Sequence, residues 1–179
     1  PVKGGEMTAI TASDSTSIFA TSYFPKDDRM LFSADGNGDE IDHLFVRELD
    51  GTIADITPDK GAKASFYGWS KDYKSLYFGS NKRDPRFFDV YKLSVDGYAS
   101  KMIYQNNDGL NFSGMSNDEN FFALSKSLNT NDSDLFLYDV KTKEMIKIND
   151  NQSANSAQDF SEDNTTFYYT TDDGGEFAY

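Results

Sequence analysis

A short phrase returns at a nearly constant interval along this 179-residue chain. It runs Ser or Pro, any residue, Asp, two or three polar residues, and then an apolar run closed by small polar residues. The repeated aspartates are Asp27, Asp72, Asp118 and Asp163, separated by 45, 46 and 45 residues. Such a fixed period predicts a chain built from equal structural modules that pack on one another.

Each module contains four stretches that suit short β-strands. Two flank the repeated turn, because an Asp carboxylate that accepts backbone N–H bonds fixes a tight reversal between strands. The third and fourth follow a polar loop and a second turn, as in "HLFVREL" and "TIADIT". Four antiparallel strands in a unit of about 45 residues are the signature of a β-propeller blade. The sequence therefore predicts an all-β propeller.

The blades can be delimited from the phase of the repeat. The expected domain spans residues 1–179, with 1–11 as the last strand of a preceding blade. Complete blades are predicted at 12–57, 58–104 and 105–149, and an incomplete, three-stranded blade at 150–179. These four blade-equivalents fit either an arc of a larger ring or a small four-bladed ring closed by pairing of the termini. The arc is favoured, because a chain that stops within a strand leaves an exposed edge.

Composition excludes several classes of function. The formal charge of −13, from 17 basic and 30 acidic residues, repels a phosphate backbone and argues against a nucleic-acid partner. The absence of cysteine excludes disulfides, thiolate metal sites and a cysteine nucleophile, and leaves the compartment undecided between periplasm and cytoplasm. The apolar stretches are far shorter than the roughly 20 residues of a membrane helix, so no membrane span is expected.

No catalytic residue is predicted in this chain. Gly68-Trp69-Ser70-Lys71-Asp72 satisfies the first and third positions of G-x-S-x-G and fails at the fifth. Ser70 also occupies the repeated turn position, which gives it a structural role. A serine triad needs a histidine base, and the single histidine, His43, opens a strand where a surface role is expected.

The acidic loop at 35–42 has some features of a calcium site. Asp35, Asn37 and Asp39 alternate as hard-cation loops require. An EF-hand loop wants Gly at its sixth position and Glu at its twelfth, and these positions hold Glu40 and Val46. We interpret the loop as a solvated hairpin and predict neither a metal site nor a cofactor.

The densest basic cluster lies in the loop "NKRDPRFF". The candidate binding residues are Lys82, Arg83, Arg86 and Phe87. Arginine forks there could bind a peptide carboxylate or dock on a partner domain. The alternative is that ion pairs, Arg83 with Asp84 or Arg86 with Asp89, merely rigidify the hairpin.

Several phrases carry a family resemblance. The Ser-x-Asp turns resemble the TolB-like variety of WD-repeat propeller. More narrowly, "SYFPKDDRMLFSAD", "GWSKDYKSLYFGSNKRDPRFFDVY" and "DFSEDNTTFYYTTDDGGEFAY" resemble the N-terminal propeller of bacterial prolyl-oligopeptidase-family serine peptidases. That resemblance implies a seven- or eight-bladed ring capping a C-terminal α/β-hydrolase domain, with peptides as substrates.

Three functions are compatible with a propeller of this kind. In the first, the chain is the non-catalytic propeller of a serine peptidase and restricts peptide entry to the hydrolase domain. In the second, it is a TolB-like platform that binds another protein without enzymatic activity. In the third and weakest, it is a metal-dependent lyase, which would need clustered histidines that a single His43 cannot supply.

Overall fold

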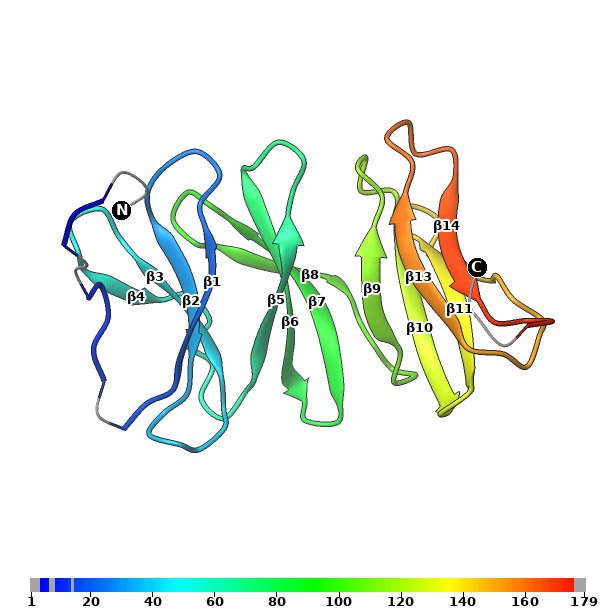
Figure 1. Cartoon of the computed structure of the whole chain (residues 1–179), viewed down its shortest axis with the longest axis horizontal. Helices are drawn as coiled ribbons and strands as arrows, with labels where there is room; N and C mark the ends of the chain where they lie inside the picture. Colours follow the sequence, from blue (N-terminus) through cyan, green and yellow to red (C-terminus); the bar gives the residue numbers. More distant parts are fainter. Residues whose placement is uncertain (1–3, 7–8, 14, 176–179) are drawn as a thin grey trace. The chain divides into compact units, whose positions relative to one another are not determined.

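In the computed structural model, every regular element is a β-strand within residues 4–6, 9–13 and 15–175, which are the residues that the structure describes. The strands form three four-stranded sheets and one two-stranded sheet, each built from strands consecutive in sequence (Figure 1). Neighbouring strands pair antiparallel. The predicted all-β architecture of repeated small sheets is confirmed.

The strand bounds follow the repeat. The first sheet has the order β1-β2-β3-β4, with bounds Ile18–Tyr23, Met30–Ala34, His43–Arg47 and Ile53–Asp55. The second has the order β5-β6-β7-β8, with bounds Ala64–Trp69, Ser75–Asp84, Phe87–Ser94 and Ser100–Tyr104. The third has the order β12-β11-β10-β9, where β9 to β12 are Asn111–Met115, Phe121–Asn129, Asp132–Asp139 and Met145–Lys147. The last pairs β13, Asn155–Phe160, with β14, Phe167–Thr171.

The chain divides into two compact units, residues 1–65 and 66–179. The first unit holds the sheet β1–β4, whose second strand is buried on both faces: Met30, Leu31 and Phe32 are all buried. Apolar residues at consecutive positions are what a strand covered on both sides requires. Phe32 stacks on Phe45 of β3 at 5.4 Å between ring centroids. This stack joins the second and third strands of the sheet.

In the second unit, one apolar cluster joins two sheets. Val90 and Tyr104 come from the sheet β5–β8, and Phe122 and Leu124 come from the sheet β9–β12. The rings of Tyr104 and Phe122 meet edge to face, with centroids 6.4 Å apart. These two sheets thus bury a face against each other, because a four-stranded sheet cannot shield that face by itself. Strand β13 also contacts β9, β10 and β11.

Two predictions about the chain need qualification. The expected loop "NKRDPRFF" is wrong in extent: β6 continues to Asp84 and β7 begins at Phe87, so only two residues separate the strands. The expected strand at residues 4–11 is not observed, because its described residues, 4–6 and 9–11, are not in a strand. Met7 and Thr8, and the expected third strand of the last blade at residues 177–179, lie outside the described residues. The blade boundaries and the choice between an arc and a closed ring stay predictions.

Candidate functional site

The four repeated aspartates hold their turns in the same way. Each accepts a bond from the backbone N–H two residues on, with N···O distances of 3.0 Å for Asp27, 3.0 Å for Asp72, 3.2 Å for Asp118 and 3.1 Å for Asp163. In the last three turns a serine hydroxyl, from Ser70, Ser116 or Ser161, donates to the same carboxylate at 2.8, 2.7 and 2.6 Å. These bonds satisfy backbone groups that the strands cannot pair.

The first turn differs because Pro25 replaces the serine. Here Asp27 binds the side chain of Arg29 through two bonds of 2.9 and 2.8 Å. The guanidinium also lies over the ring of Phe24 at 4.2 Å. A charged fork therefore fills the place of the hydroxyl.

These bonds lower the pKa of all four turn carboxyls below the ordinary value of 3.8. The largest causes are the Arg29 side chain at Asp27, the Lys74 N–H at Asp72, and the serine hydroxyls at Asp118 and Asp163. A lowered folded-state pKa means that the unfolded chain binds more protons in acid. The stabilisation is therefore present above about pH 4 and is lost as the pH falls through the folded-state values.

We accordingly expect the urea midpoint of unfolding to fall as the pH is lowered from about 5 to about 3. The double variant Asp72→Asn and Asp163→Asn should show a shallower fall, because an amide keeps an acceptor for the N–H bond but does not titrate. Urea titrations at a series of pH values measure both slopes. Equal slopes in the two proteins would contradict this role for the carboxylates.

Ser70 belongs to the turn and not to a nucleophile elbow. Its side chain is buried, donates to Asp72 and accepts the N–H bond of Ser75 at 3.0 Å. A serine nucleophile needs an accessible oxygen beside a general base. His43 begins β3, and its Nδ1 lies 2.8 Å from Oδ2 of Asp55 on β4. Ser70 thus stabilises its turn, and His43 links the strands β3 and β4.

The oxygens of the acidic loop are bonded within the first unit. The bonds run from the Ser17 N–H to Asp35, from the Ser15 hydroxyl to Asn37, and from the Gly36 and Ile41 N–H groups to Asp39, at 3.2, 2.9, 3.0 and 3.0 Å. These bonds hold the loop to its own backbone and to the segment before β1. Within the described ranges, no three acidic or histidine side chains gather where they could hold a metal ion.

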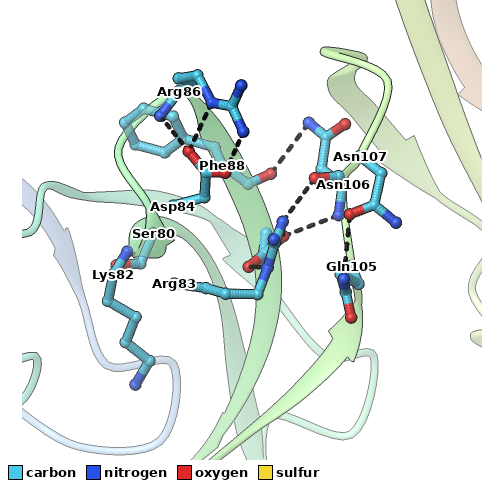
Figure 2. A network of polar contacts seen from close by, with 10 residues as sticks. Ser80, Lys82, Arg83, Asp84, Arg86, Phe88, Gln105, Asn106 and Asn107 are labelled. Carbon is cyan, nitrogen blue, oxygen red and sulfur yellow. Dashed lines mark hydrogen bonds and ion pairs between the residues drawn. The ribbon is translucent and has the colours of Figure 1, made fainter.

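Arg83, one of the four predicted binding residues, is bound to a buried carboxylate. Its Nε and Nη2 lie 2.7 and 2.8 Å from the two oxygens of Asp89, whose side chain is 0% exposed. Nη2 also donates to the backbone carbonyl of Asn106 at 2.7 Å, so that the guanidinium bridges the β6–β7 hairpin and the segment after β8 (Figure 2). This bond with Asp89 raises the pKa of Arg83. The Arg83 guanidinium is therefore engaged by groups of its own chain.

Asn106 completes this network from the other side. Its backbone N–H donates to Asp89 at 2.8 Å, and its side-chain amide donates to the carbonyls of Phe88 and Leu110 at 3.2 and 2.6 Å. Asn106 was not singled out from the sequence, and Asp89 was named there only as a possible partner of Arg86. The sequence does contain a signal for Asp89, because an acidic residue stands between Phe88 and Val90 at the start of an apolar strand. A carboxylate at such a position is buried only when it has partners.

The predicted alternative ion pairs were wrong. Arg83 pairs with Asp89, and Arg86 pairs with Asp84 through contacts of 2.7 and 3.0 Å. The reason is a bulge: Ser80 faces Asp89 and Asp84 faces Phe87, so the residues between Ser80 and Asp84 are out of register. A bulge redirects side chains relative to a regular strand.

The other predicted binding residues separate by exposure. Arg86 stands at the tip of the hairpin with 75% of its side chain exposed, and its guanidinium lies 5.0 Å from the ring centre of Phe87. Lys82 lies over the ring of Tyr91 at 4.5 Å. The structure therefore brings Arg86 and Phe87 together at the tip and pairs the guanidinium of Arg83 with the buried Asp89.

The chain is similar to known proteins in sequence and in fold. Residues 9–178 match the model of a family described as prolyl oligopeptidase, N-terminal β-propeller domain. No curated protein matches the chain. The described part of the chain contains no helix with the length and apolar character needed to cross a membrane.

Solved structures show the same fold. TolB from Acinetobacter baumannii is 19% identical with a TM-score of 0.61, over 92% of this chain and 40% of that one. A prolyl endopeptidase is 13% identical with a TM-score of 0.62, over 92% and 26%. An oligogalacturonate lyase in complex with manganese is 18% identical with a TM-score of 0.69, over 98% and 50%. At such identities the likeness concerns the fold alone, and the chain spans half or less of each structure.

Proposed function

Because this chain belongs to the family of prolyl oligopeptidase N-terminal β-propeller domains, we propose that it is the non-catalytic propeller of a serine peptidase. In this proposal it restricts and steers the access of peptides to a C-terminal α/β-hydrolase domain of the same parent protein. The observation that carries the proposal is the family match over residues 9–178. The bonding of Ser70 within a turn supports a division in which the chemistry belongs to the other domain.

The proposed mechanism is steric. A propeller ring with a narrow axial tunnel or side opening would exclude a folded protein by size while it admits an extended peptide. The exposed tip of the β6–β7 hairpin supplies the contact for steering, through Arg86, which is paired with Asp84 and lies near the ring of Phe87. We assign this pair the contact with the hydrolase domain or with a peptide carboxylate, since an arginine fork suits either.

The test compares the 179-residue chain, the parent protein and the parent without this segment. The chain alone should not hydrolyse a short fluorogenic peptide. The parent should cleave that peptide and spare a folded protein that carries the same sequence in a structured region. Removal of the propeller should reduce this discrimination, as measured by the ratio of kcat/KM for the two substrates.

Two results would contradict the proposal. One is turnover by the isolated chain that a serine-directed inhibitor blocks. The other is a parent protein that continues past the propeller without a G-x-S-x-G elbow followed by Asp and His, which would instead favour a TolB-like binding platform.

A further inference from the structure

The second unit contains a cavity of about 470 Å³ beside the outer strands of two neighbouring sheets. Its apolar side is formed by Met102 and Tyr104 of β8, Tyr138 of β11 and Met145 of β12. The rings of Tyr104 and Tyr138 meet at 4.9 Å with an angle of 65° between their planes. Its volume lies in the range of about 300–1,000 Å³ that small-molecule sites occupy.

Two opposite charges line the same cavity. Lys143 comes from the turn before β12, and Asp108 comes from the loop after β8. Burial is the main cause that raises the pKa of Tyr104 to about 12, and the negative charge of Asp108 adds to it, which places this carboxylate near the cavity wall. Within residues 66–175, neither Lys143 nor Asp108 has an ion-pair partner, although Arg83, Arg86, Lys92 and Lys147 each have one.

We propose that this cavity binds a short peptide with free termini. Lys143 receives the terminal carboxylate, Asp108 receives the terminal ammonium group, and the thioethers of Met102 and Met145 with the two tyrosine rings receive an apolar side chain. A zwitterion with an apolar body matches all three features, because each ionic group needs an opposite charge and the wall offers an apolar surface. A ligand that carries only a negative charge would be repelled by Asp108, and one that carries only a positive charge would be repelled by Lys143.

The backbone at Lys143 indicates that its side chain is not needed by the turn. Lys143 has a φ of 64°, in the left-handed region that favours glycine. In the second sheet, the turn of the same length closes between Ser94 and Ala99, and the residue before its closure is Tyr98, with a φ of 55°. Unlike side chains thus occupy the same turn position in this chain. Lys143→Gly removes the charge and is expected to keep or raise the thermal midpoint.

The test is calorimetric titration of the 179-residue chain with the tripeptide Ala-Phe-Ala and with its N-acetylated, C-amidated form. The free tripeptide should bind at least about tenfold more tightly than the blocked one, because each terminus gains a charge-assisted hydrogen bond. Lys143→Gly and Asp108→Asn should each weaken binding at least about tenfold. The matched control Lys141→Gln, in the same turn but outside the cavity lining, should leave the affinity unchanged.

Three outcomes would overturn the assignment: no heat with the free tripeptide, equal binding of the blocked form, or variants at Lys143 and Asp108 that bind as the parent chain does. Thermal unfolding of each variant shows whether a lost signal reflects lost structure. The assay contains no hydrolase domain, so its result is independent of the access function proposed above.

Discussion

Gly79→Ala should destabilise the second unit by about 2–3 kcal/mol, as expected for an extra methyl group forced into a filled core. Gly79 is buried in β6, and a Cβ built on it would lie 2.1 Å from the hydroxyl oxygen and 2.4 Å from Cζ of Tyr67. Tyr67 cannot simply turn away, because its ring stacks on Phe112 with centroids 4.8 Å apart. Relief therefore requires the ring stack or the strand to shift. Urea unfolding followed by circular dichroism measures the loss.

Gly114→Ala is the matched control. Gly114 lies in β9 opposite Ala123, has no positive φ, and an added Cβ meets nothing within 4 Å. Alanine there should be neutral or should stabilise by up to about 0.5–1 kcal/mol, since glycine in a strand loses more chain entropy on folding. If both substitutions cost the same, the close approach of Tyr67 to Gly79 would not be the reason.

The sequence predicted the repeated elements because their signals are local. The turn at Asp72 needs only a carboxylate and a hydroxyl two residues apart, and the burial of Leu76 and Phe78 follows from their apolar character. The need for glycine at position 79 is not local, because the ring that excludes a methyl group comes from the preceding strand. The left-handed conformation of Tyr73, with a φ of 60°, was equally hidden, since tyrosine does not signal it.

The charged pairs show where register carries information that spacing does not. Asp55 lies opposite Phe45, and Lys147 lies opposite Phe136. Two residues before each phenylalanine stands the partner: His43 binds Asp55 at 2.8 Å, and Asp134 binds Lys147 at 2.8 Å. The two sheets thus place an ion pair at the same two positions, with the acid and the base exchanged. A search of the repeats for one residue type at each position does not find this pair.

The second sheet departs from this pattern, because Met102 lies opposite Tyr91. Asp89, two residues before Tyr91, therefore has no basic partner on the outer strand. Arg83 supplies the charge from the bulged hairpin instead, which explains why sequence spacing assigned the wrong acid to each arginine. The structure has the hairpin that the sequence predicted here, and the binding role of its basic residues stays a prediction. That Arg83 binds a buried carboxylate while Arg86 pairs at the exposed tip was not predictable from composition.

Asp89→Ala should cost about 3 kcal/mol, the lower end of what removal of one partner from a buried ion pair costs. Asp89 accepts bonds from Arg83 at 2.7 and 2.8 Å and from the Asn106 N–H at 2.8 Å. After substitution the buried N–H of Asn106 loses its acceptor, whereas the guanidinium, 27% exposed, can still reach water. Urea unfolding measures the loss, and the melting of the β8–β9 segment can be followed by amide hydrogen exchange at Leu110.

Asp84→Ala is the matched substitution in the same hairpin, because Asp84 pairs with the exposed Arg86. It should shift the urea midpoint far less, since an ion pair in contact with water contributes little. The variant Arg83→Ala, combined with Asp89→Ala in a double-mutant cycle, should show strong coupling, because each residue is the main partner of the other. Equal shifts for Asp89→Ala and Asp84→Ala, or additive effects in the cycle, would mean that the network orders the hairpin without stabilising the fold. Arg83 would then be as available for binding as Arg86, and the distinction between the two arginines would have to be abandoned.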